Sequence, residues 1–199
     1  MTQTSPLCTL PRMTEQARPS ERARVPAARG RAFHVRLGMT GLCFGLVPPF
    51  VLSRARTHAL RACGVRIGFA STFHGQPRLI GDGPVAGRLT IGDYCGFNDG
   101  CLFDLAAPVA IADHVSVGHQ VRFLTRKLPP GEPRQLDGQE LAAPIAVGAG
   151  AWIGARCTVL GGVSIGAGAV VGAGVTVAQD VPPNTLWTGA QAVSLARWR

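Results

Sequence analysis

The five histidines are the side chains best suited to move a proton near neutral pH, because imidazole titrates close to pH 6.5. They are His34, His58, His74, His114 and His119. His119 follows Val117-Gly118 and precedes a long stretch rich in Pro, Gly and charge. A histidine at such a place can act as a general base that deprotonates a hydroxyl or an amine, if an acidic group orients it.

The elements that must position these side chains are set by a period of six residues. Aliphatic residues recur without a break from Val147 to Val177, and four of the six are followed by Gly. The same period runs from Ile67 to Val109, and after a shift of two it continues at Ile111, Val117 and Phe123. Six is not a multiple of 3.6, so the repeat is not helical. It predicts short strands joined by corners, three to a coil of about eighteen residues.

Inside such coils alternate residues point inward, so the position of each remaining candidate in the period assigns it to the core or to the surface. Cys95, Cys101 and Cys157 fall two residues before an inward aliphatic residue, so we expect them to fill the core. Trp152 falls on an outward position, where it can line a groove or a subunit contact. With the two-residue shift, His119 should stack above Asp99 of the preceding coil, which makes this pair the predicted catalytic base and its supporting carboxylate.

The repeat divides the chain into four parts. Residues 1–30 are expected to be a disordered basic arm, 31–64 a helical segment broken at Pro48-Pro49, 65–180 the β-helix, and 181–199 a C-terminal cap. Residues 125–143 interrupt the coils, and an excursion of this length in a solenoid is typical of a functional loop or of disorder. The predicted fold class is therefore all-β.

The net charge of +9 belongs to the N-terminal third, where residues 1–66 hold eleven Arg and two Glu. This arm could touch anionic lipid. It lacks the aromatic-rich basic surface of a nucleic-acid-binding protein, so we expect no nucleic-acid partner. No signal peptide is evident and the apolar run 37–52 is short for a membrane span, which favours a cytoplasmic protein with peripheral contact at the inner membrane face.

Several segments resemble the bacterial hexapeptide-repeat acetyltransferases, nearest the polysaccharide-biosynthesis branch that includes colanic acid acetyltransferases. The segments are LRACGVRIG, LTIGDYCGFNDGCLFD, VAIADHVSVGHQVRFLT and APIAVGAGAWIGARCTVLGGVSIGAGAVVGAGVTVAQDVPPNT. The resemblance implies a left-handed parallel β-helix, a homotrimer, and transfer of an acyl group from acetyl-CoA to a small acceptor such as a sugar. It also implies active sites between subunits.

The resemblance further implies roles for particular residues. Coenzyme A would lie along the corners at Gly154, Ala155, Gly172 and Ala173, with Trp152 nearby. Asp104 ends the strand GCLFD, where the family often has an Asp that holds the acceptor. Arg126 and Lys127 would contact an anionic acceptor or the phosphates of the cofactor.

Two motifs depart from the family pattern. The family carries its catalytic His after a Thr at the start of the excursion, but here the stretch is Thr125-Arg126-Lys127-Leu128. After VPPNT the family often has a Pro and a basic residue, but here the chain reads Gly189-Ala190-Gln191-Ala192-Val193.

These departures keep a second hypothesis open, a diverged scaffold without transfer activity. A third is a zinc hydratase of the γ-carbonic anhydrase type, since His114 and His119 are five residues apart. Zinc at a catalytic site takes three protein ligands, and the position for a further His is Leu124. We therefore expect no metal.

Overall fold

The computed structural model describes residues 23–24, 48–81, 87–127, 141–189 and 192–194. Most of the basic arm, the first half of the expected helical segment and the middle of the excursion lie outside these residues. Of residues 1–30, the structure describes Ala23–Arg24, which form strand β1.

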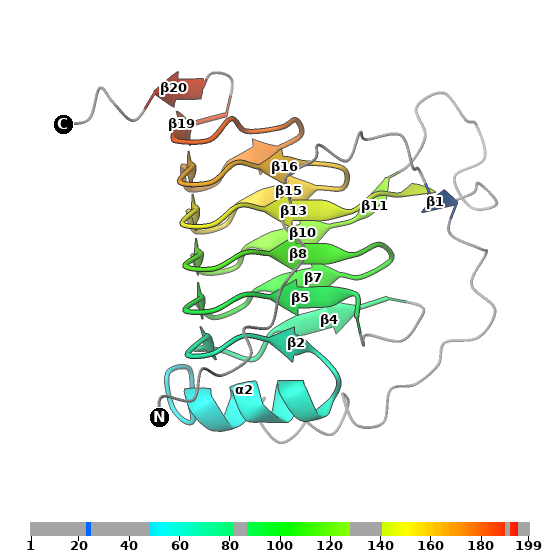
Figure 1. Cartoon of the computed structure of the whole chain (residues 1–199), viewed down its shortest axis with the longest axis vertical. Helices are drawn as coiled ribbons and strands as arrows, with labels where there is room; N and C mark the ends of the chain where they lie inside the picture. Colours follow the sequence, from blue (N-terminus) through cyan, green and yellow to red (C-terminus); the bar gives the residue numbers. More distant parts are fainter. Residues whose placement is uncertain (1–22, 25–47, 82–86, 128–140, 190–191, 195–199) are drawn as a thin grey trace, which may run out of the picture.

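The coils form a three-sided parallel β-helix, which confirms the fold class predicted from the six-residue period (Figure 1). The first face consists of β2 (Arg66–Ile67), β5 (Leu89–Ile91), β8 (Val109–Ile111), β13 (Ile145–Val147) and β16 (Ser164–Ile165). The second face consists of β3 (Thr72–Phe73), β6 (Gly96–Phe97), β9 (Ser116–Val117), β14 (Trp152–Ile153), β17 (Val170–Val171), β19 (Thr185–Trp187) and β20 (Ala192–Ser194). The third face consists of β4 (Arg78–Ile80), β7 (Leu102–Asp104), β10 (Arg122–Leu124), β15 (Thr158–Leu160) and β18 (Thr176–Val177).

The core is a continuous column of the inward residues. Phe73 stacks on Phe97 with ring centroids 4.5 Å apart, and Phe103 stacks on Phe123 at 4.9 Å. The three cysteines at the small inward position are buried as predicted (Cys95, Cys101 and Cys157). Burial raises the pKa of all three thiols, that of Cys101 to about 12.

The coils differ in length at one corner only. The parallel pairings align one residue of each coil on the first face: Ile67, Ile91, Ile111, Val147 and Ile165. The residues by which a coil exceeds eighteen lie between its third-face strand and the next first-face strand. We call this edge the third corner; its described residues are 81, 87–88, 105–108, 125–127, 141–144 and 161–163. The two-residue shift seen in the sequence is thus an insertion in the turn after β7, and the excursion leaves from the same corner.

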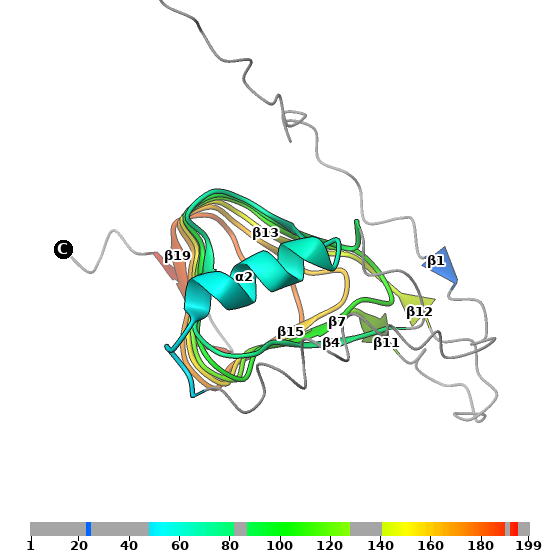
Figure 2. The ribbon, with the colours of Figure 1, turned by 90° about the horizontal axis from the view of Figure 1, so that it is seen from below.

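The lower end of the stack is covered by helix α2 (Ser53–Ala62), which lies across the coil in the view from below (Figure 2). Leu60 packs into the core, and Arg56 is buried with Nη1 donating to the carbonyl oxygens of Phe73 and His74. At the upper end β19 continues the second face and pairs antiparallel with β20, where the sequence predicted a cap.

A small antiparallel sheet stands beside the third corner. The excursion enters it as β11 (Arg126–Lys127) and returns as β12 (Leu141–Ala142), which also pairs with β1. Among the described residues, no helix has the length and apolar character needed to cross a bilayer.

Candidate functional site

The turn between the second and the third face, here called the second corner, carries most of the predicted site residues. It comprises 74–77, 98–101, 118–121, 154–157 and 172–175. The strand registers on the second face align Phe97, Val117, Ile153 and Val171. Two residues further on, Asp99, His119, Ala155 and Ala173 therefore occupy the same place in successive coils. The corner thus brings the predicted base and two predicted cofactor residues into one line along the helix axis.

His119 is exposed at the lower part of this line. Its carbonyl oxygen accepts the N–H of Arg156 at 2.7 Å, which fixes the backbone against the next coil. The ring of Phe50 lies near, with centroids 6.5 Å apart. The imidazole is therefore accessible to a ligand that follows the corner.

Asp99 stacks below His119 as the period predicts, but its carboxylate faces the preceding coil. A Cβ placed on Gly75 would lie 1.8 Å from Oδ1 of Asp99, so this oxygen sits directly over Gly75. Asp99 also raises the pKa of buried Arg56, against the larger opposite effect of burial. The hydrogen bonds of the described residues include none between the side chains of Asp99 and His119. The pair therefore shares a column without a direct contact between the two side chains.

The glycines of the second corner have different structural reasons. A Cβ on Gly118 would lie 2.5 Å from the backbone N of Ala155, and one on Gly154 would lie 2.6 Å from that of Ala173. Close stacking of the coils requires glycine at both positions. Gly172 is different, because its Cβ would meet nothing nearer than 3.5 Å. Gly172 is thus the predicted cofactor glycine that the chain's own packing does not demand.

Small residues leave an open strip above His119. Ala155 is half-buried, Ala173 is exposed, and the space around a Cβ on Gly174 is empty to 4 Å. Trp152 stands on the adjoining second face with 57% of its side chain exposed, as its outward position predicts. The strip and the indole together could accept an extended ligand running along the helix axis.

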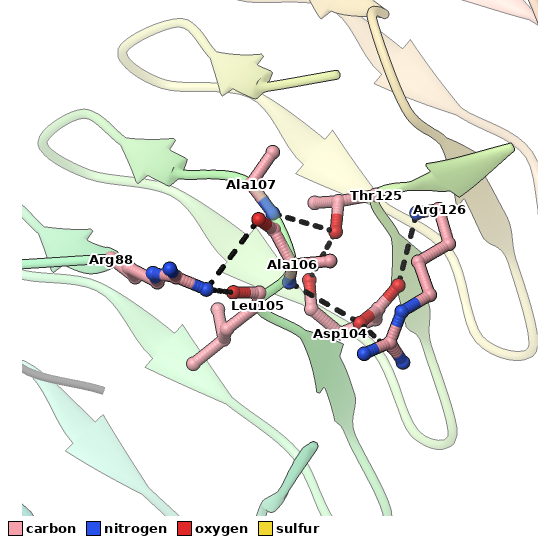
Figure 3. A network of polar contacts seen from close by, with 7 residues as sticks. All are labelled: Arg88, Asp104, Leu105, Ala106, Ala107, Thr125 and Arg126. Atoms are coloured by element: carbon pink, nitrogen blue, oxygen red, sulfur yellow. Dashed lines mark hydrogen bonds and ion pairs between the residues drawn. The ribbon is translucent and has the colours of Figure 1, made fainter. Parts of the chain in front are cut away.

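The third corner holds a separate polar network, drawn in Figure 3. Asp104 is buried, and its Oδ1 lies 3.3 Å from Nη1 of Arg126 while Oδ2 accepts the backbone N–H of Arg126 at 3.0 Å. The hydroxyl of Thr125 donates to the carbonyl oxygen of Asp104 at 2.9 Å and accepts the N–H of Ala107 at 3.2 Å. These contacts fix the point where the excursion departs.

A second arginine reaches the same turn from below. Nη1 of Arg88 donates to the carbonyl oxygen of Leu105 at 2.7 Å. The sequence interpretation missed both Arg88 and Thr125, because their partners are backbone atoms of other coils. The register of β10 on β7 aligns Leu124 with Asp104 and so places Thr125 one residue beyond it, at the turn.

The structure brings Asp104 and Arg126 together, but it does not bring them to His119. The two corners are separated by the width of the third face, about 16 Å for the five residue steps from Gln120 to Thr125. Lys127 is the second residue of β11, and its side chain lies outside the described parts. A site that uses both corners would need two copies of the chain.

The other histidines lie at different positions. His114 stacks on Tyr94 with rings 5.1 Å apart on the corner between the first and the second face. His74 begins the second corner in the lowest coil, and its ring lies 5.0 Å from that of Phe50, which is also near His119. His34 lies outside the described residues. No three His, Cys, Asp or Glu side chains of the described ranges gather as ligands for a metal.

Comparisons with known proteins agree with this architecture. Residues 144–179 match the family model for the bacterial transferase hexapeptide of six repeats. Nodulation protein L of Rhizobium meliloti (strain 1021) is 39% identical over 105 residues, 53% of this chain and 57% of that protein. The chain spans about half the length of the curated relatives it matches.

Solved structures match over a larger share. A hexapeptide-repeat acetyltransferase from Vibrio cholerae superposes with a TM-score of 0.70 at 25% identity, covering 80% of this chain and 88% of that one. The complex of that protein with acetyl coenzyme A superposes with a TM-score of 0.62 at 28% identity, covering 80% of this chain and 83% of that one. A maltose O-acetyltransferase from Clostridium difficile 630 superposes with a TM-score of 0.63 at 25% identity, covering 78% of this chain and 79% of that one. The likeness confirms the left-handed form of the β-helix expected from the resemblance.

Proposed function

We propose that the chain is a hexapeptide-repeat transferase and that it moves an acyl group, acetyl in the first instance, from coenzyme A to a hydroxyl or an amine of a small acceptor. The observation that carries the proposal is the second corner, where exposed His119 lies on one line with Ala155 and Ala173. The maltose O-acetyltransferase and nodulation protein L among the similar proteins favour a sugar as the acceptor.

His119 is the base of the proposed reaction. Its imidazole takes the proton of the acceptor O–H or N–H as the acceptor atom attacks the carbonyl carbon of the thioester. The tetrahedral intermediate then collapses, the C–S bond breaks, and the thiolate of coenzyme A leaves with the electron pair. The imidazolium returns its proton to that sulfur, so the base is regenerated. Asp99, one coil below in the same column, is the supporting carboxylate of the proposal.

The donor occupies the open strip of the second corner. The thioester lies beside His119, and the pantetheine arm passes Ala155, Gly172 and Ala173. Because these residues are small, the arm can approach the protein backbone closely. Trp152 covers the ligand from the second face. Acetyl-CoA is a substrate here, and no metal takes part in the proposed route.

The acceptor is held by the third corner of a neighbouring copy. Arg126 presents its guanidinium, and Asp104 acts as a positioning residue, because its carboxylate already receives two donors of Arg126. Lys127 adds a second cation on β11. Since His119 lies on a different corner, the acceptor site would lie between two copies of the chain, as in the homotrimer that the resemblance implies. An enzyme that uses acetyl-CoA would be cytoplasmic, and the basic arm of residues 1–30 would contact the anionic inner face of the membrane.

A diverged scaffold without transfer activity is the second candidate. The observation that favours it is the excursion, which begins Thr125-Arg126-Lys127-Leu128 and so lacks the histidine of the family. The third-corner network would then serve to hold the excursion alone.

Release of free coenzyme A thiol from acetyl-CoA distinguishes the two. Purified protein is incubated with acetyl-CoA and a panel of sugars and amines, and the thiol is measured with and without acceptor. Acceptor-dependent release supports the transferase. Release no faster than in the protein-free control across the panel, in a protein that still folds, supports the scaffold.

A further inference from the structure

The described part of the chain carries its excess of positive charge at one end of the stack. Residues 48–81, which form α2 and the lowest coil, contain five Arg and no Asp or Glu. Residues 87–127 contain four Lys or Arg and four Asp, and residues 141–189 contain one Arg and one Asp. The coils above are therefore neutral in sum, and the basic surface is the lower end that Figure 2 shows from below.

Three of these five arginines are available to a partner. Arg56 is buried, and Arg61 donates to two carbonyl oxygens of the lowest coil. The other three are exposed on α2, β2 and β4: Arg54, Arg66 and Arg78. Within the described ranges no carboxylate forms an ion pair with any of these three. Exposed cations gathered at one end of a molecule attract an anionic surface.

An apolar turn adjoins these cations where α2 begins. Residues 48–52 read Pro-Pro-Phe-Val-Leu, and all five are exposed. Phe50, Val51 and Leu52 expose 60%, 49% and 57% of their surface, whereas large apolar side chains are mostly buried in folded proteins. Arg54 follows in the first turn of α2. A contiguous apolar patch that is exposed beside a cation indicates an interaction surface.

The turn is fixed in this exposed form. The N–H of Phe50 donates to the carbonyl oxygen of His74 at 2.6 Å, and the hydroxyl of Ser53 donates to the carbonyl oxygen of Phe50 at 3.2 Å. The φ angles of Phe50 and Leu52 are 69° and 56°, in the left-handed region that bulky residues rarely adopt. Because burial of these side chains does not stabilise the conformation, the strain points to a role outside the fold.

The kind of partner follows from the combination of charge and apolar surface. A second copy docked end to end would bring two sets of arginines together without a carboxylate, which is unfavourable. A nucleic acid would contact the cations but leave Val51 and Leu52 in water. An anionic bilayer matches both features, because its phosphates attract arginines and its interfacial region takes up apolar side chains.

We propose that the lower end of the β-helix binds an anionic bilayer, with the apolar turn 48–52 entering the interface. Arg54 contacts lipid phosphates beside the turn, and Arg66 and Arg78 add to the attraction from the flanks. This surface belongs to the folded domain, so it is distinct from the contact proposed for the basic arm of residues 1–30. It is also independent of acyl transfer.

Vesicle binding by the full chain tests the proposal. Sedimentation with vesicles of phosphatidylcholine alone is compared with sedimentation with vesicles that also contain phosphatidylglycerol. The double variant Phe50→Asn, Leu52→Asn removes two apolar side chains, and Asn tolerates the left-handed backbone, so the fold should be kept. Trp152→Asn is the matched control, because Trp152 is 57% exposed on β14, away from the lower end.

Wild type should sediment with the mixed vesicles far more than with phosphatidylcholine alone. The double variant should bind the mixed vesicles about tenfold or more weakly, since two apolar side chains no longer leave water. Arg54→Gln should weaken this binding about fivefold, as expected for one arginine at an anionic surface. Arg156→Gln is its control, because Arg156 is an exposed arginine away from the lower end. Both controls should bind like wild type.

Equal vesicle binding by wild type and a folded double variant would overturn the proposal. Replacing Arg12, Arg18 and Arg22 by Gln in the full chain tests the basic arm, and loss of binding in that variant alone would assign the contact to the arm instead. Duplex DNA that displaces the vesicles and binds the double variant as tightly as wild type would make nucleic acid the partner.

The release of coenzyme A thiol is measured separately from vesicle binding. A protein that binds the mixed vesicles but transfers no acyl group would refute the proposed function and leave this inference standing. A transferase whose vesicle binding is unaffected by the double variant would do the reverse.

Discussion

The carboxylate of Asp104 binds Arg126 twice, with Oδ1 3.3 Å from Nη1 of the guanidinium and Oδ2 accepting the backbone N–H at 3.0 Å. The two residues are at the end of β7 and the start of β11, in successive coils. One buried side chain therefore fixes both the backbone and the side chain at the first step of the excursion. This relationship gives Asp104 a structural role, and in the proposed reaction Arg126 is the group of the pair that contacts the acceptor.

Asp104→Asn should lower the free energy of unfolding by about 1–3 kcal/mol, because a buried charge-assisted pair is broken. Arg126→Gln should lower the free energy of unfolding by less, since the Arg126 side chain is 27% exposed and the carboxylate of Asp104 still accepts the backbone N–H of residue 126. Denaturant unfolding followed by circular dichroism measures both. Equal midpoints for wild type and Asp104→Asn would show that the pair does not hold the excursion.

The fold was predictable because the six-residue period places each inward residue without knowledge of distant contacts. Val147, Ile153 and Val159 are buried as the period requires, and so is Cys157 two residues before Val159. The length of each coil was less evident, since all insertions fall at the third corner and the sequence shows them only as a change of phase.

The sequence predicted which residues of the candidate site stack in one column, but it did not predict the contacts of their side chains. The period placed His119 above Asp99, whereas the direction of the Asp99 carboxylate depends on Gly75 in the coil below. The bond between Gln120 and Arg156 joins residues 36 positions apart across the insertion, which a single sequence does not reveal. Thr125 likewise acts on backbone atoms of another coil, and backbone partners leave no pattern of residue types.

His119→Ala should reduce acceptor-dependent release of coenzyme A by about a hundredfold or more, because a general base contributes at least that factor. The binding of coenzyme A should change little. His114→Ala is the matched control, since His114 is an exposed corner histidine that stacks on Tyr94 away from the strip. Turnover that survives His119→Ala at the wild-type rate would assign the base elsewhere.

Asp99→Asn should lower turnover without loss of a hydrogen bond to the base. The carboxylate shares the column of His119 and lies over Gly75, so the variant should reduce kcat and leave the binding of coenzyme A unchanged. Asp93→Asn is the control, because Asp93 makes the analogous coil-to-coil contact on another corner, accepting the N–H of Phe69. Wild-type kcat in an Asp99→Asn protein of lower stability would confine Asp99 to a structural role.

The buried thiols should make the protein sensitive to alkali. An unfolded Cys ionises near pH 8.5, whereas burial raises the pKa of Cys101 to about 12 in the folded state. Between these values the unfolded chain releases a proton that the folded chain keeps, so stability falls as pH rises. The Cys101→Ala variant should lose stability less steeply with pH, by as much as about 1.4 kcal/mol per pH unit in that window. Urea midpoints from pH 7 to pH 10 measure this, and parallel curves for the two proteins would contradict it.

The Gly172→Ala variant distinguishes an effect on ligand binding from an effect on the stability of the fold. Its added Cβ meets nothing closer than 3.5 Å, so the variant should unfold at nearly the wild-type midpoint. If the pantetheine arm passes this residue, the methyl group should weaken coenzyme A binding about tenfold, as expected for an obstructed close approach.

Gly154→Ala is the comparison for this last prediction. Its Cβ would lie 2.6 Å from the backbone N of Ala173, so it should lower the unfolding midpoint whether or not a ligand binds. Calorimetric titration with coenzyme A and thermal unfolding of both variants provide the two readouts. Unchanged affinity in a stable Gly172→Ala protein would move the donor off the second corner, and with it the assignment of Ala155 and Ala173.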